Sequence, residues 1–95
     1  MRFVGTLVDR REKVEIKDVS GFVDVNTGAD FNWDGFLNIP EGAVLETGET
    51  YLLVIDEGRS GEILIQEILS QPHKAEVATF LGLGPPPLPP NNPSL

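Results

Sequence analysis

The chain has 95 residues, no cysteine and a formal net charge of −8, with 40% hydrophobic and 23% charged residues. A chain of this length forms one domain with a thin core, because it buries only about 60–65% of its unfolded surface. The lack of cysteine excludes disulfides and thiolate metal sites. The first residues, MRFVGTLVDRREK, contain too short an apolar run for a signal peptide, so we expect a cytoplasmic protein.

The charge is unevenly distributed along the chain. Residues 1–20 hold five of the seven basic side chains, whereas residues 24–57 contain eight acids and neither Lys nor Arg. Such a surface repels a phosphate backbone and favours basic protein surfaces or cations. The alternative explanation is that the acids only keep a small domain soluble.

Apolar residues recur at a period of two, which is typical of half-buried β-strands. We predict strands over residues 2–9 and 13–19. Residues 21–25 form either a separate strand or a continuation past a bulge at Ser20-Gly21. Runs rich in β-branched residues predict further strands over 50–56, 61–69 and 74–83. No stretch has the capped amphipathic pattern of a helix.

The best-defined local structure is the junction VIDEGRSGEI, between two apolar runs. It predicts a three-residue hairpin loop, Asp56-Glu57-Gly58, in which Gly58 takes the left-handed conformation after a type I turn. A backbone-lined anion pocket at GRSG is the less favoured interpretation.

Residues 30–41, DFNWDGFLNIPE, match the calcium-loop template D-x-[DN]-x-[DN]-G-x5-E at every fixed position. The ligands of such a site would be Asp30, Asn32, Asp34, Phe36 through its carbonyl oxygen, and Glu41. However, neither flank predicts the helix that an EF-hand needs, and Phe31 and Trp33 would be exposed. We therefore favour a strand or turn that buries Trp33, with Asp34-Gly35 as a hairpin turn or as a glycine kink within one strand.

The composition changes after Gly84, where PPPLPPNNPSL holds six of the eight prolines. These residues predict a polyproline II tail over 85–95, after a β domain over 1–84. PPPLPP has the P-x-x-P spacing that aromatic-lined grooves bind. Because no Arg or Lys flanks it, we favour a solvated tail, or one folded back over the barrel, above docking into an aromatic groove.

Enzymatic chemistry finds little support in the sequence. The only histidine, His73, lies in the polar segment SQPHK, and there is neither a Ser-His arrangement nor a glycine-rich phosphate loop. We expect no catalytic residues and no cofactor, with calcium as the exception if residues 30–41 form a metal loop.

Four segments occur together: W-x-G-x-L from Trp33 to Leu37, then TGETYLL, EGRSGEI and TFLGLG. This combination resembles short uncharacterised bacterial β proteins over residues 20–84. The resemblance implies that these positions are structural, as an aromatic strand, a hairpin and a closing strand. It implies no activity, ligand or functional residue.

These patterns predict an all-β fold of six or seven antiparallel strands in a small barrel or sandwich, with a C-terminal polyproline tail. An OB-fold is disfavoured because no helix is expected between the middle strands. The expected function is a non-enzymatic protein-binding or assembly module that uses its acidic surface or an exposed strand edge. Its partner would be a protein or a second copy, and neither nucleic acid nor a membrane. The alternatives are a calcium-binding β domain and a small acidic inhibitor that mimics nucleic acid.

Overall fold

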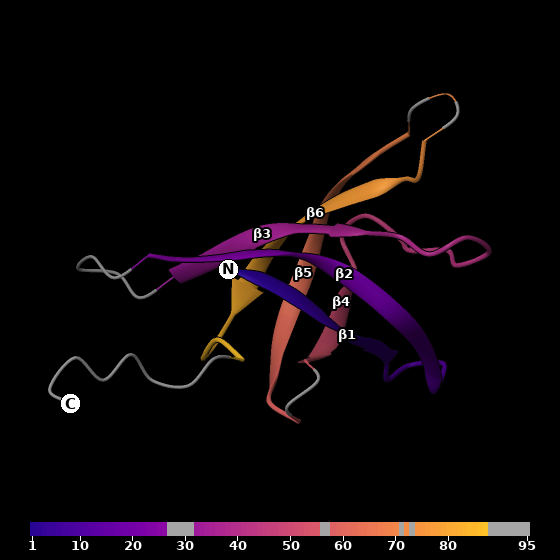
Figure 1. The fold of residues 1–95 in the computed structure, drawn as a ribbon. Coiled ribbons are helices and arrows are strands. Elements are labelled where there is room, and N and C mark those ends of the chain that lie inside the picture. Colours follow the sequence, from indigo (N-terminus) through magenta and orange to yellow (C-terminus); the bar gives the residue numbers. More distant parts are fainter. Residues whose placement is uncertain (27–31, 56–57, 71, 73, 88–95) are drawn as a thin grey trace, which may run out of the picture.

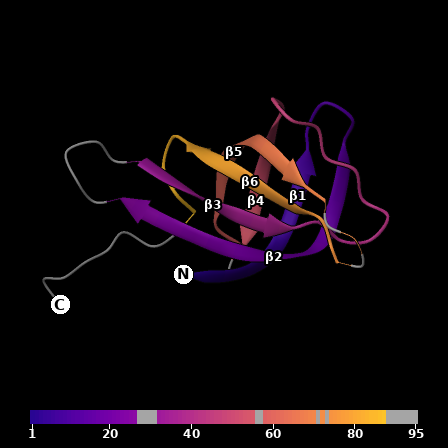
Figure 2. The ribbon, with the colours of Figure 1, turned by 90° about the horizontal axis from the view of Figure 1, so that it is seen from above.

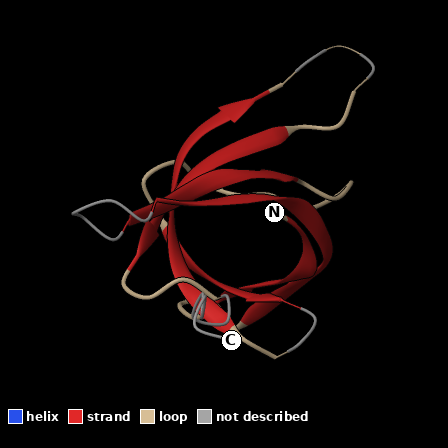
Figure 3. Ribbon diagram, turned by 60° about the vertical axis from the view of Figure 1, so that its left-hand side comes forward, coloured by secondary structure: helices blue, strands red, loops and turns tan. Residues whose placement is uncertain are grey.

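The computed structural model describes residues 1–26, 32–55, 58–70, 72 and 74–87. Six antiparallel strands form a closed barrel in the order β1-β2-β3-β6-β5-β4 (Figures 1 and 3). The strands are β1 (Arg2–Asp9), β2 (Val14–Asn26), β3 (Asn32–Asn38), β4 (Thr50–Ile55), β5 (Ser60–Leu69) and β6 (Val77–Leu83). The predicted small antiparallel all-β fold is confirmed, and of the two predicted architectures the barrel is found. None of the described residues belongs to a helix that could cross a membrane.

The barrel consists of two three-stranded meanders, β1-β2-β3 and β4-β5-β6, which join along β1–β4 and β3–β6. Every strand therefore has two neighbours, and closure of this kind removes the free outer strands of an open sheet. The longest extensions are those of β2 and β5, which run past the residues that pair with β1 and β4. Figure 1 shows these extensions as the β2–β3 and β5–β6 hairpins, which project from the barrel in different directions.

Of the two alternatives for residues 21–25, continuation of one strand is found, because β2 runs through Ser20-Gly21. The register is regular at these two residues, so the predicted position of the bulge is wrong. The register between β1 and β2 shifts instead between Gly5 and Leu7, opposite an extra residue at Lys17-Asp18. Asp18 has a φ of 62°, a left-handed conformation that Asp adopts more readily than a bulky or β-branched residue does. The prediction placed the bulge at Gly21. The bulge instead includes Asp18, whose side chain points to solvent.

The predicted hairpin between β4 and β5 is found, as far as its residues are described. Gly58 has a φ of 85°, and its N–H donates to the carbonyl oxygen of Ile55 at 2.8 Å. The Ile55 N–H in turn donates to the carbonyl oxygen of Arg59 at 2.9 Å, which closes the loop. The other two predicted loop residues, Asp56 and Glu57, lie outside the described residues.

The core fills the interior of the barrel from alternate positions on every strand. Its buried members are Phe3, Leu7, Val19, Val23, Trp33, Leu37, Ile39, Leu45, Tyr51, Leu53, Ile55, Ile63, Ile65, Ala78 and Phe80. Side chains at period two point to the same side of a strand, so the same alternation leaves the intervening side chains on the outer surface.

One end of the barrel, where β3 begins and β6 ends, is closed around Trp33, which is 2% exposed. The indole Nε1–H donates to the carbonyl oxygen of Gly84 at 2.9 Å, and the ring meets Phe80 edge-on with centroids 6.0 Å apart. A Cβ at Gly82 would overlap the indole ring, so only glycine leaves room for it. Pro87, the last described residue, is fully buried at this end. We call this the Trp33 end.

Candidate interaction surface

The outer face of β1, β2 and β3 carries exposed apolar side chains. The strand register places Phe22 of β2 opposite Phe36 of β3. Their rings stack with centroids 6.2 Å apart and an interplanar angle of 13°. Although each covers part of the other, Phe22 remains 39% and Phe36 43% exposed. Two aromatic rings are therefore held against each other on the outside of the barrel, where they add nothing to the core.

An open groove of about 740 Å³ lies beside this pair, and its walls include Met1, Val4, Phe22 and Phe36. The N-terminus lies beside β2 (Figure 2). The Met1 ammonium donates to the Val23 carbonyl oxygen at 2.7 Å, and the Val23 N–H donates to the Met1 carbonyl oxygen at 2.8 Å. Met1 is thereby fixed at the rim of the groove, 49% exposed, and Val4 is 51% exposed. We call these four residues the Phe22–Phe36 face.

Two carboxylates adjoin the Phe22–Phe36 face. Asp24 of β2 lies directly opposite Asp34 of β3, each two residues away from the phenylalanine of its own strand. Both side chains therefore point outward, and both residues are exposed. Neither forms an ion pair with a described basic residue. Like charges directly opposite each other are destabilising, so this acid pair is an unneutralised negative site on the barrel surface.

The structure places the predicted calcium ligands along a strand. Asn32, Asp34 and Phe36 occupy alternate outward positions of β3, and Glu41 follows in a turn, whereas Asp30 lies outside the described residues. Alternate strand positions are about 6.6–6.8 Å apart, but calcium ligands surround one ion at about 2.3–2.6 Å. Within the described ranges, no three His, Cys, Asp or Glu side chains are grouped to hold a metal ion. Because Asp30 is not described, the calcium site stays a prediction.

The strand interpretation of the same segment is confirmed in its main feature. Trp33 is a buried core residue on β3, as the alternation of residues 30–41 predicted. Asp34-Gly35 forms no hairpin turn, because β3 continues through both residues. Of the two alternatives for this dipeptide, a glycine within one long strand is the one found.

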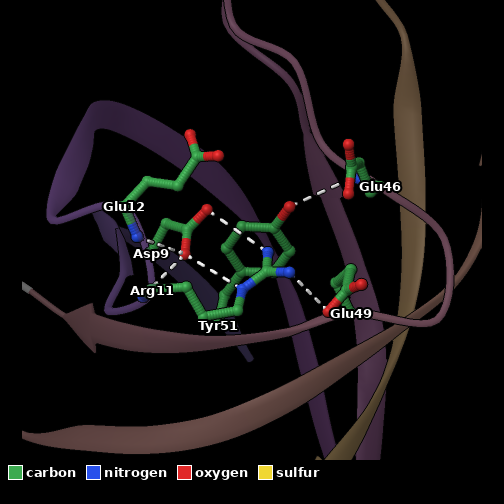
Figure 4. Close-up of polar contacts among 6 residues, drawn as sticks. All are labelled: Asp9, Arg11, Glu12, Glu46, Glu49 and Tyr51. Carbon is green, nitrogen blue, oxygen red and sulfur yellow. Dashed lines mark hydrogen bonds and ion pairs between the residues drawn. The ribbon is translucent and has the colours of Figure 1, made fainter.

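A second polar cluster lies where β1 ends and β4 begins, at the end of the barrel opposite to Trp33. Figure 4 shows its side chains. Asp9 stands at an inward position of β1 and is only 9% exposed. The Arg11 guanidinium donates to both Asp9 carboxylate oxygens at 3.3 Å and pairs with Glu49 at 2.6 Å. It also lies over the Tyr51 ring, 5.9 Å from its centroid, within the range of a cation–π contact. We call this the Arg11 end.

The electrostatics of this cluster favour its charged form. Burial alone would raise the pKa of Asp9, but it is outweighed by hydrogen bonds from the Arg11 and Glu12 N–H groups and by the Arg11 charge. The pKa of Asp9 is therefore lowered. Desolvation acts against the charge of Arg11, yet Asp9 and Glu49 raise its pKa.

The Arg11 end also leaves few groups for a ligand. The Tyr51 hydroxyl accepts a hydrogen bond from the Glu46 N–H at 3.1 Å. Among the described residues, no buried side-chain nitrogen or oxygen lacks a hydrogen-bond partner. These groups are satisfied by one another, so we interpret the Arg11 end as a structural seal and the Phe22–Phe36 face as the candidate site.

The sequence did not reveal the Phe22–Phe36 face, because the pairing of the two rings depends on the β2–β3 register. A weak signal was present nonetheless. In the alternation of β2 and β3, each phenylalanine falls on the phase that is otherwise polar. A large aromatic residue on the outward phase of two neighbouring strands is the pattern that could have indicated this surface. His73 lies outside the described residues.

Comparison with known proteins identifies no relative: no protein-family model matches the sequence, and no match is found among curated proteins or solved structures.

Proposed function

We propose that the chain is a non-enzymatic protein-binding or assembly module with an acidic surface, acting in the cytoplasm. The observation that carries this proposal is the Phe22–Phe36 face. Its four apolar side chains are between 39% and 51% exposed and lie beside one groove, three of them on β1, β2 and β3 and Met1 directly before β1. Contiguous exposed apolar surface on a small domain is typical of interaction sites.

The chemistry of the face supports a macromolecular partner. Aromatic side chains are enriched at protein interfaces, where they provide large contact areas with little loss of conformational entropy. Here the stacked rings restrict each other before any partner binds. Buried side chains fill the barrel interior, so the outer surface is the place where a ligand finds space.

The charge of the chain favours a different protein above a second copy. Two copies, each with a formal net charge of −8, repel each other. A basic partner is attracted instead, and its association is faster at low ionic strength. A homo-oligomer remains the alternative form of assembly, and light scattering at low and high salt distinguishes the two.

The proposal is tested by capture experiments with matched variants. Phe22→Ser and Phe36→Ser each remove one ring of the face. Val44→Ser removes an apolar side chain that is 79% exposed elsewhere, between β3 and β4, and serves as the control. We expect proteins from an extract of the producing cells to be retained by the wild type and by Val44→Ser, and lost with both phenylalanine variants. Circular dichroism verifies that every variant is folded.

Equal retention by all four proteins would contradict the proposal, because binding would not depend on the Phe22–Phe36 face. Repeating the capture with a chelator tests the calcium-binding alternative, for which chelation should abolish retention. Our proposal expects that chelation has no effect.

A further inference from the structure

The proposed function leaves the partner open, and the acid pair specifies its chemistry. We propose that the Phe22–Phe36 face and the acid pair together bind an extended peptide segment in which an apolar side chain and an Arg or Lys stand two residues apart. The apolar side chain packs against the phenylalanine rings, and the cation lies between Asp24 and Asp34. This inference rests on the proposed function and names the class of partner.

The spacing of the two cross-strand pairs matches that of alternate residues in an extended peptide. Phe22 pairs with Phe36, and Asp24 pairs with Asp34, two residues further along both strands. On a strand, two residues correspond to about 6.6–6.8 Å. An extended peptide lying along β2 and β3 has the same distance between its residues i and i+2, so it meets the rings and the carboxylates in register.

The electrostatics of the acid pair favour a cationic ligand. Cross-strand neighbours have Cβ atoms about 4.5–5.5 Å apart, so one cation between Asp24 and Asp34 reaches both carboxylates. The nearest basic strand position is Arg2, opposite Phe22 on β1. It forms no ion pair with either carboxylate in the described part of the chain. A cationic ligand therefore relieves a repulsion that the free protein leaves uncompensated.

Other ligands suit the site less well. Calcium takes about six to eight oxygen ligands, and the acid pair supplies two carboxylates. A nucleic-acid backbone or a second copy brings further negative charge. A guanidinium group, in contrast, binds carboxylates with several N–H donors and stacks on aromatic rings. Both features lie side by side here, so we expect Arg to be preferred to Lys.

Selection from a phage-displayed library of random peptides tests this inference without presupposing a sequence. The immobilised wild-type protein should select peptides in which Arg or Lys stands two positions from an apolar residue. The best selected peptide is then synthesised, and its dissociation constant is measured by fluorescence anisotropy. For the double variant Asp24→Asn/Asp34→Asn, we expect weaker binding at low salt, with a dissociation constant at least tenfold larger than that of the wild type.

The control variant removes the same number of negative charges at positions outside the proposed site. Glu15→Gln/Glu41→Gln changes one exposed carboxylate on β2 and one in the turn after β3. It should bind the selected peptide as the wild type does, apart from a small general effect of net charge. Thermal unfolding of both double variants confirms that they are folded.

The inference is overturned if the selected peptides show no enrichment of Arg or Lys, or if no peptide is selected. It is also overturned if both double variants weaken binding equally, because only net charge would then matter. None of these outcomes touches the proposed function, which depends on loss of the captured partner in Phe22→Ser and Phe36→Ser. Retention of that partner by both phenylalanine variants would refute the proposed function separately.

Discussion

The two ends of the barrel are closed by different chemistry. At the Trp33 end, an indole ring fills the space that Gly82 leaves free and contacts Phe80. At the Arg11 end, a guanidinium group joins the carboxylates of Asp9 and Glu49 across β1 and the start of β4. The first closure depends on shape and apolar burial, which are insensitive to pH. The second depends on charge, which changes with pH and salt.

This difference bears on the proposed binding surface. The Phe22–Phe36 and Asp24–Asp34 pairs lie on the outer side of β2 and β3. Inward residues of the same strands are buried: Val23 belongs to the core, and Trp33 closes the Trp33 end. The side chains beneath the proposed binding surface are therefore apolar, and their packing does not depend on pH. The ligand affinity of that surface, in contrast, should depend on salt because the acid pair is exposed.

The largest expected effect is that of Trp33→Ala. Removing a fully buried indole leaves a cavity and costs about 3–5 kcal/mol. The total stability of a domain of 95 residues is about 5–14 kcal/mol, so much of it would be lost. At about 4–8 °C per kcal/mol, we expect the melting temperature to fall by more than about 10 °C, as measured by circular dichroism.

Phe36→Ala is the matched control, because it truncates an aromatic residue of the same strand that is 43% exposed on the opposite face. It should lower the melting temperature far less than Trp33→Ala does. Similar effects of the two variants would show that the Trp33 end is not the main apolar closure of the barrel.

Much of the Trp33 end was predictable from the sequence, because it depends on the alternation of apolar residues within single strands. The burial of Trp33 follows from its place at period two, and the left-handed Gly58 follows from the turn between two apolar runs. The bulge at Lys17-Asp18 was not predictable, because it depends on how β1 and β2 fit together. Local pattern predicts which residues face inward, whereas the register between strands is a property of the assembled barrel.

The same reasoning explains why the sequence indicated an acidic surface but not the position of the proposed binding surface. The run of eight acids between residues 24 and 57 is visible in the sequence. That two of them, Asp24 and Asp34, face each other beside two stacked rings depends on the β2–β3 register. The calcium-loop template likewise reads residues 30–41 as a compact loop, although their described part is largely an extended strand.

A smaller effect is expected at the Arg11 end, with Asp9→Asn. The pKa of Asp9 in the folded protein lies below its ordinary value of 3.8. Its carboxylate therefore contributes stability above that value, and the contribution is lost as the pH falls through the lowered pKa. We expect Asp9→Asn to melt several degrees below the wild type at pH 7. The difference should narrow as the pH falls through that lowered pKa, where the folded wild-type carboxylate becomes protonated as well.

Glu15→Gln is the control for this comparison, because Glu15 is an exposed carboxylate on β2 outside the Arg11 cluster. Its melting temperature should stay close to that of the wild type over the same pH range. If the effect of Asp9→Asn were constant from pH 7 to pH 3, charge would not be what closes the Arg11 end.

The smallest expected effect concerns the tail, and it defines where the Trp33 end stops. Pro87 is fully buried, and a Cβ on Gly61 would approach its Cδ to 2.9 Å. Gly84 accepts the hydrogen bond of the Trp33 indole. Deleting residues 88–95 removes neither contact, so the melting temperature should stay within about 1 °C of that of the full chain. Deleting residues 85–95 also removes the burial of Pro87 and should lower the melting temperature by a few degrees, with unfolding still cooperative. Equal melting temperatures for the two truncated chains would show that Pro87 contributes nothing to the Trp33 end, and that Trp33 with its strand neighbours closes it alone.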